Sequence, residues 1–292
     1  MISLSLIMVL CMMLPMIPAY AAETHNLPSE YKELEYVESD GNQFIDTGIP
    51  FNSKLVVDVT FQVTIPVLAG RGGGAGIVGA YSGGGNANGC IQFAYKRNES
   101  DTAFTTRIGT LLCNDPAILP KDTNKHSVTL DCPGGKIIFD GKTVASKDPA
   151  EIKIDDNSSG LCNMLISAAN FSETTTEITK FGIGASKIFS VTFKKDGAVI
   201  ADFVPAKRVS DGIVGMYETV GKKFYTNAYP EKTDVSFIAG PEIVVEAPAT
   251  GPAVATGSNP KTGDGLVFVA IAAAAAVVLS AGTAILIRKK EN

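Results

Sequence analysis

The sequence predicts an all-β fold, an antiparallel β-sandwich, and three observations support this prediction. Apolar residues recur with period two in several runs, as expected of strands that bury one face. Turn dipeptides separate neighbouring runs, and tight turns of this kind join antiparallel strands. No soluble window shows a sustained helical period. Many short strands joined by short turns are typical of sandwiches and related barrels.

Two runs show the alternation most clearly. In residues 55–63, every second residue is apolar and the residues between them are mostly polar. The apolar set is Leu55, Val57, Val59, Phe61 and Val63. In residues 188–194, the same period predicts that Phe189, Val191 and Phe193 share one face. Both runs are predicted to be half-buried strands.

Three turns are predicted between such runs. Asp140-Gly141 and Asp196-Gly197 each separate two apolar runs. Asp-Gly favours a type I′ hairpin turn, because that turn needs positive φ at both central residues. Pro133-Gly134-Gly135 joins residues 128–132 to residues 137–139 in the same way.

The C-terminal end carries one predicted transmembrane helix. Residues 266–287 are apolar and uncharged, and the run matches the about 20 residues that a helix needs to cross a bilayer. A helix is expected because backbone amides in lipid must be satisfied within the segment. Arg288, Lys289 and Lys290 follow the run. Basic residues stay on the cytoplasmic side, so residues 288–292 form a cytoplasmic tail and the rest of the chain lies outside.

The pentad Asn259-Pro260-Lys261-Thr262-Gly263 lies just before this span. The order of pentad, apolar span and basic tail in residues 259–292 resembles the cell-wall sorting signal of Gram-positive surface proteins, whose common form begins Leu-Pro-x-Thr-Gly. The resemblance implies that a sortase cleaves between Thr262 and Gly263 and transfers Thr262 to peptidoglycan. The Asn-Pro form is similar to the variant associated with class B-like sortases, and Asn259 leaves the sortase class open. An ordinary single-pass anchor is the alternative.

Residues 1–22 are predicted to be a signal peptide. They carry no charge, and the apolar run of residues 2–13 is too short to span a bilayer comfortably. Ala19 and Ala21 give the small-x-small pattern of a signal-peptidase site. The segment lacks the usual basic n-region, and a buried N-terminal helix is the alternative.

Charge limits the partners of the exported portion, which ends at Thr262. It contains 22 basic and 28 acidic residues and no basic cluster. Nucleic acid and anionic membrane surfaces are therefore poor candidates as partners. Residues 241–258 are rich in Pro, Ala, Thr and Gly, and we expect a linker that reaches at most about 60 Å when fully extended.

Eight segments of residues 27–240 carry a further resemblance. They are residues 27–39, 44–49, 125–130, 139–142, 188–190, 202–208, 211–217 and 224–227. Together they resemble a domain that is common on surface proteins of gut Gram-positive bacteria. That family is similar to the laminin-G-like, concanavalin A-like jelly rolls, so the resemblance implies this form of sandwich and binding of a glycan or an extracellular protein.

Residues 74–79 match a dinucleotide-binding glycine pattern, but the glycines that follow cannot carry the required helix. A strand is predicted instead. The glycine-rich stretches 70–76 and 83–89 are predicted to be plain loops, with a binding mouth as the alternative.

Tyr81, Tyr95 and Tyr225 are the candidate sugar-stacking rings in a chain without Trp, and sandwich packing is the alternative for each.

No catalytic set is predicted. Glu33, Glu35 and Glu38 lie close together in sequence, but glycoside hydrolysis needs two carboxyls on opposite sides of one bond. We interpret them as a solvated strand face. His25 is placed in a frayed N-terminus. His126 has the parity of Val128 and Leu130, so we expect it on the apolar face, as a core or rim residue rather than a base.

Metal and cysteine expectations follow from residue types. Asp155, Asp156 and Asn157 are candidate calcium ligands, although calcium takes six to eight oxygens, and an exposed turn is the default. Otherwise we expect no cofactor.

Four cysteines remain after removal of the predicted signal peptide. Export permits disulfides between them, with three possible connectivities. Buried free thiols are favoured for all four, which are Cys90, Cys113, Cys132 and Cys162.

Taken together, these patterns predict a surface-displayed, sortase-anchored binding or adhesion module without catalysis. Its expected partners are sortase, peptidoglycan and an unidentified glycan or extracellular protein. The alternatives are a polysaccharide hydrolase on the same scaffold and a structural wall protein without a ligand.

Overall fold

The computed structural model describes residues 25–65, 74–81, 90–96, 102–154, 162–171 and 181–244. The chain divides into two compact units, Met1–Val245 and Glu246–Asn292, and all described residues belong to the first. The predicted signal peptide, sorting signal and candidate calcium ligands 155–157 lie outside the described residues, as do the apolar run 266–287 and the linker beyond residue 244. Within the described ranges, no helix is long and apolar enough to cross a membrane.

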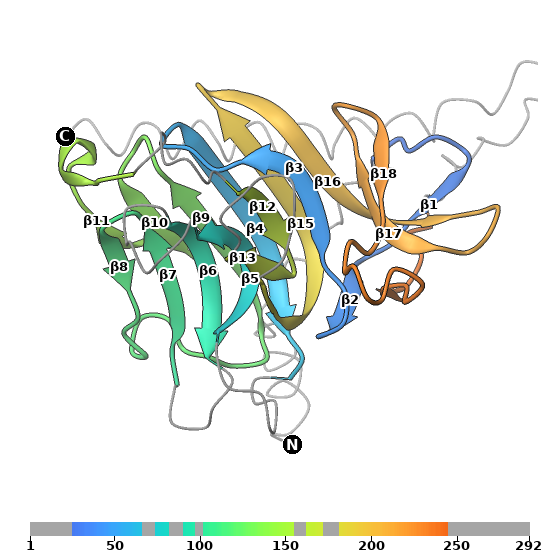
Figure 1. The fold of residues 1–292 in the computed structure, drawn as a ribbon, viewed down its shortest axis with the longest axis horizontal. Helices are drawn as coiled ribbons and strands as arrows, with labels where there is room; N and C mark the ends of the chain where they lie inside the picture. Colours follow the sequence, from blue (N-terminus) through green and yellow to red (C-terminus); the bar gives the residue numbers. More distant parts are fainter. Residues whose placement is uncertain are drawn as a thin grey trace, which may run out of the picture. The chain divides into compact units, whose positions relative to one another are not determined.

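The larger of two sheets is built around a long antiparallel pair (Figure 1). This pair is β4 (Leu55–Val63) and β15 (Ala185–Lys195). The sheet order is β11 (Lys142–Ser146), β10 (Lys136–Phe139), β9 (Lys125–Asp131), β4, β15, β16 (Ala198–Arg208), β17 (Val214–Glu218) and β18 (Lys223–Tyr225). Three shorter strands join it, β1 (Tyr31–Glu33) on β16, β2 (Val37–Asp40) on β15 and β19 (Ile238–Ala239) on β2.

The smaller sheet carries the glycine-rich strand that the sequence predicts. Its order is β13 (Ala168–Asn170), β14 (Phe181–Ile183), β5 (Gly74–Tyr81), β6 (Cys90–Lys96), β7 (Phe104–Ile108) and β8 (Leu111–Cys113). β12 (Asn163–Ile166) pairs with β5 and with β3 (Ile45–Pro50). The described pairings are antiparallel except for two parallel bridges of β5, one to β13 and one to β14. The all-β two-sheet sandwich is therefore confirmed, and its laminin-G-like, concanavalin A-like assignment stays a prediction.

The core lies between the two sheets. The alternation in β4 is confirmed, because its five apolar side chains at odd positions are buried and its even positions are half-buried. The ring of Phe61 on β4 lies 5.0 Å from Phe93 on β6 and 5.5 Å from Phe104 on β7, measured between ring centroids. Burial of such rings is the main driving force that holds two sheets together.

The predicted Asp-Gly hairpins are confirmed. Asp140 and Gly141 have φ of 47° and 74°, and Asp196 and Gly197 have φ of 51° and 81°. Positive φ at both central residues is the requirement of the type I′ turn. The first pair joins β10 to β11 and the second joins β15 to β16.

One face prediction is wrong, in β15. The pairing of β15 with β4 shifts register between Ile188 and Ser190, so Phe189 is an extra residue. Ile188, Val191 and Phe193 are buried, whereas Phe189 is half-buried. A β-bulge of this kind changes which face a side chain takes, and an alternating pattern read across it gives the wrong face.

The two ends of the described unit pair with each other. The Glu35 N–H donates to the Pro241 carbonyl (2.8 Å) and the Ile243 N–H donates to the Glu33 carbonyl (2.9 Å). Leu34 and Glu242 form an isolated antiparallel bridge. Residues 238–243 thus continue β19 along the segment that links β1 to β2.

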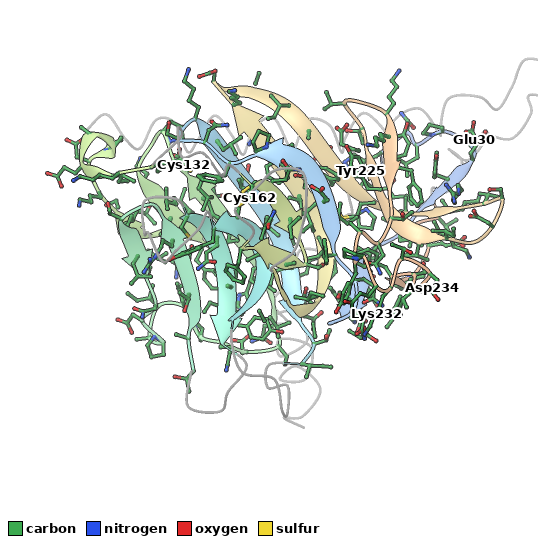
Figure 2. The ribbon with its side chains drawn as sticks, in the orientation of Figure 1. Glu30, Cys132, Cys162, Tyr225, Lys232 and Asp234 are labelled. Carbon is green, nitrogen blue, oxygen red and sulfur yellow. The ribbon has the colours of Figure 1, made fainter. Side chains whose placement is uncertain are left out.

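The four cysteines of the described residues are buried thiols that form no disulfide with one another, as the sequence favours. Figure 2 labels two of them, Cys132 and Cys162. Burial raises the pKa of the Cys162 thiol to about 11, and burial also raises the pKa of Cys90 well above its ordinary value. Since the thiolate is the reactive form of cysteine, both thiols are unreactive at neutral pH.

A buried carboxylate holds the hairpin that joins β17 to β18. Glu218 is 5% exposed. It accepts hydrogen bonds from the backbone N–H groups of Asp202 (3.1 Å), Val220 (2.7 Å) and Gly221 (2.6 Å). The turn therefore depends on an acceptor-only group at this position.

Glu218→Gln tests this dependence. The glutamine amide turns an NH₂ toward backbone donors, and we expect the free energy of unfolding to fall by about 1–3 kcal/mol. Urea denaturation measures the change. Glu35→Gln, at an exposed position, is the control and should shift stability by less than about 0.5 kcal/mol. Equal denaturation midpoints for the two variants would contradict the role of Glu218.

Candidate functional site

The extra residue in β15 presents an aromatic ring on the outer surface of the larger sheet. Phe189 lies 5.5 Å from Tyr36 in an edge-to-face arrangement. The Lys125 ammonium lies 3.8 Å from the Phe189 ring centroid, and the Lys187 ammonium lies 4.2 Å from the Tyr36 centroid. These four residues, Tyr36, Phe189, Lys125 and Lys187, are called the outer aromatic face below.

Strand register brings these residues to one side of the sheet. Lys125 on β9 is opposite Gln62 on β4, and Gln62 is opposite Lys187 on β15. Lys187 is opposite Glu38 on β2, and Glu38 is opposite Ile238 on β19. Directly opposed residues in a sheet point to the same side. Five strands therefore contribute one row of side chains, which runs across the sheet beside the two rings.

Backbone contacts hold both ends of the face in place. The Gly240 N–H donates to the Tyr36 carbonyl (3.0 Å). A Cβ at Gly240 would lie 2.7 Å from that carbonyl oxygen and 2.9 Å from the Tyr36 ring, so only glycine allows this approach. At the other end, the Gln62 side-chain amide donates to the Thr123 carbonyl (2.8 Å), just before Lys125.

The chemistry of the face suits binding. Half-buried rings offer flat apolar surfaces, and cations over such rings are attracted by the ring electrons. The lysines supply hydrogen-bond donors, and Glu38 supplies an acceptor. Such a combination of apolar surface with a few polar groups is typical of ligand sites.

Asp58 of β4 and Glu38 of β2 are too far apart to act as a hydrolytic pair. The carboxylate of β4, Asp58, lies four residues from Gln62, about 13 Å along the strand at about 3.3 Å per residue. Glycoside hydrolases need carboxyls about 5–9.5 Å apart. Asp58 is also engaged, with Lys194 (2.9 Å) and with the Thr129 hydroxyl (2.5 Å).

His126 lies on the inner face of β9, as predicted. It is 9% exposed and is packed among the rings of Phe61, Phe104 and Phe139, whose centroids lie 6.0, 6.1 and 4.7 Å away. Ser127 is exposed and points away, also as predicted.

Two carboxylates contact the His126 ring, and no sequence pattern predicted either contact. Nδ1 lies 2.8 Å from Asp140 and Nε2 lies 2.8 Å from Asp122. Partial burial tends to raise the pKa of Asp122, but the Asn124 N–H and the His126 ring more than offset this and leave that pKa below its ordinary value.

The predictions for the N-terminal acids and His25 need correction. The Glu33 side chain is 8% exposed rather than solvated, because it binds both the backbone N–H and Nδ1 of His25 at 2.9 Å. His25 is thereby held in place, and its Nε2 lies 3.9 Å from Asp202. Glu35 is exposed as predicted, and Glu38 is half-buried beside the outer aromatic face.

The candidate sugar-stacking tyrosines are not brought together. Tyr95 is fully buried, and its hydroxyl accepts from the Ala185 N–H (3.0 Å), so it is a packing residue. Tyr225 packs on Phe203 at the edge of the core (5.2 Å; Tyr225 is labelled in Figure 2). Tyr81 contacts Phe171 on the smaller sheet (5.9 Å). Residues 66–73 and 82–89, which contain most of the glycine-rich stretches predicted to be loops, lie outside the described residues.

A double-mutant cycle tests the ring–lysine contact. Lys125→Ala and Phe189→Ala should each destabilise the fold slightly, and the pair should show a coupling free energy of about 0.5–1 kcal/mol from the cation–π contact. Urea denaturation of the four proteins gives this value. The same cycle with Lys136→Ala, at an exposed position of β10, should be additive within about 0.3 kcal/mol. Additivity in both cycles would show that the contact does not form.

Comparisons with known proteins give only a distant similarity. No protein-family model matches the chain, and no curated protein matches it. Solved structures that match include the CBM40 module of the Ruminococcus gnavus IT-sialidase, alone and bound to α2,3- or α2,6-sialyllactose. Identity is 11–12%, the match covers 55% of this chain and 89–90% of those chains, and the TM-scores are 0.33–0.35.

Proposed function

We propose that this chain is a non-catalytic binding module that takes a glycan at the outer aromatic face. The observation that carries the proposal is the bulge that turns Phe189 outward beside Tyr36. Two half-buried rings on an outer surface leave apolar area in contact with water, and a ligand that covers this area gains hydrophobic free energy. Flat rings fit the apolar faces of sugar rings, and the neighbouring polar side chains fit their hydroxyl groups.

The two lysines favour acidic glycans over neutral ones. Each ammonium lies over a ring, and the salt bridges found among the described residues do not include Lys125 or Lys187. A sugar that stacks on either ring displaces the ammonium from it. A carboxylate or sulfate on the ligand then provides a new partner for that ammonium, whereas a neutral sugar does not.

The proposed setting is the bacterial cell wall. Support comes from the sequence alone, from the signal-peptide pattern of residues 1–22 and the sorting pattern of residues 259–292. Sortase would join Thr262 to peptidoglycan, release Gly263 onward and leave the sandwich outside the cell. Localisation, sortase and peptidoglycan are thus parts of the proposal.

A glycan array probed with residues 23–258 tests the ligand class. The array holds neutral and acidic glycans, sialyllactose among them, and is read with and without added calcium. We expect binding to acidic glycans, and we expect Phe189→Ala to weaken it by at least about tenfold, or about 1.4 kcal/mol, through loss of the stacking surface.

Phe224→Ala is the matched control, because Phe224 is also half-buried beneath a cation, Arg208, at 5.4 Å. This variant should bind as the wild type does. If Phe224→Ala loses binding and Phe189→Ala retains it, the binding site lies at the β18 end of the larger sheet instead of at the outer aromatic face. If no glycan on the array binds, but host-matrix proteins tested in the same way do bind, the ligand is a protein and not a glycan.

Thr262→Ala tests the anchoring. The resemblance to the sorting signal makes Thr262, side chain included, part of the pentad that sortase recognises, so the variant should stay in the membrane fraction, while the wild-type chain is released from the wall only by peptidoglycan hydrolases. Lys261→Ala, at the variable position of the pentad, should still be attached to the wall. Wall-linked Thr262→Ala protein would overturn the assignment.

A further inference from the structure

His126 has more hydrogen-bond acceptors around it than a neutral imidazole can serve. Its Nδ1 and Nε2 each lie 2.8 Å from a carboxylate oxygen, of Asp140 and Asp122 respectively. A neutral ring carries one N–H and one lone pair, whereas the imidazolium carries two N–H groups. Both contacts are therefore hydrogen bonds only when the ring is doubly protonated. In the neutral ring, one carboxylate faces a lone pair.

The remaining surroundings of the ring are uncharged. Phe61 of β4, Phe104 of β7 and Phe139 of β10 pack around it. Among the described contacts of the ring, Asp122 and Asp140 are the titratable groups. The adjacent Lys125 is exposed and extends over Phe189 on the outer side of the sheet. The proton on His126 thus responds mainly to these two carboxylates.

Asp140 is the more firmly held of the two. Its other carboxylate oxygen accepts from the Ser127 N–H (2.8 Å), and its own N–H donates to the Ser127 carbonyl (3.0 Å). Asp122 belongs to the loop before β9, and its Oδ1 is shared between His126 and the Asn124 N–H (2.7 Å). A neutral ring therefore keeps its proton on Nδ1, toward Asp140, and the Asp122 contact is lost.

The Asp122 loop, residues 121–124, reaches the outer aromatic face. Thr123 of this loop accepts from Gln62, which lies in the row between the two lysines. The loop leads directly into Lys125, the residue whose ammonium lies 3.8 Å from the Phe189 ring centroid. The contact of Asp122 with His126 fixes this loop from the inner side of the sheet.

We propose that His126 is a proton-operated latch on the outer aromatic face. At mildly acidic pH the doubly protonated ring holds the Asp122 loop and keeps Lys125 over Phe189. As the pH rises and the ring loses a proton, the loop is released, Lys125 leaves the ring and Phe189 becomes accessible. The regulatory meaning of the latch rests on the proposed function of this face, but the movement itself does not.

The movement is measurable without a ligand. Reductive methylation with ¹³C-formaldehyde places methyl groups on the lysine amines of residues 23–258, and a methyl group over an aromatic ring shows an upfield ring-current shift. We expect the Lys125 signal to lose most of this shift as the pH is raised and the imidazolium becomes neutral. Its midpoint should coincide with that of the His126 ring protons. The Lys187 signal, over Tyr36, is the internal control and should not change.

Three variants decide between the latch and a general pH effect. Asp122→Asn removes the charged partner and should leave the Lys125 signal independent of pH, as should His126→Gln. His25→Gln removes the other histidine of the chain and should leave the wild-type titration. If His126→Gln does not fold, Asp122→Asn still gives the test.

Two results would overturn the latch. One is a Lys125 signal that titrates in Asp122→Asn as it does in the wild type. The other is a constant Lys125 signal in the wild type while His126 titrates. The absence of glycan binding on the array changes neither of these two NMR results. Failure of the proposed function and failure of the latch are therefore distinguishable.

Discussion

The pairing of β4 with β15, with its one extra residue, is the constraint on which the larger sheet depends. The ladder runs over most of both strands, from Ser186 opposite Val63 to Lys195 opposite Leu55. Had it continued without a bulge, Phe189 would share a face with Val191. The extra residue lets Ile188 and Val191 both point into the core, and it leaves one large aromatic side chain outside. Core packing and the candidate binding surface are thus two results of a single register shift.

The sequence predicted the fold well because the signals involved are local. Alternation in β4 and the two Asp-Gly turns depend on neighbouring residues alone, and the structure confirms them. The parity of His126 likewise predicted its burial. The parity of Lys125, the next residue on β9, places it on the outer side in the same way.

The site was less predictable because it depends on contacts between distant segments. A bulge arises when an extra residue costs less than breaking the pattern on either side, and no residue type at Phe189 signals it. Tyr36 and Lys187 meet only through the pairing of β2 with β15. The carboxylates at His126 come from a loop and a turn, where neither period two nor turn chemistry predicts side-chain contacts.

Both histidines of the chain face two carboxylates that come from different segments. His126 lies between Asp122 and Asp140, and His25 lies between Glu33 and Asp202. In a chain of formal charge −5, this arrangement places both imidazoles where negative charge is concentrated.

The pairing of residues 238–243 with the segment between β1 and β2 has a mechanical consequence. In the proposed wall-anchored setting, a pulling force on the C-terminal end would act on the pairing with Leu34 and Glu35, which is the most C-terminal pairing among the described residues. Gly240 of the same stretch packs against Tyr36. Loss of this pairing would disturb the outer aromatic face while leaving the β4–β15 ladder intact. Under the proposed anchoring and binding, shear flow and ligand retention would be linked through a few backbone hydrogen bonds at the C-terminal end of the described residues.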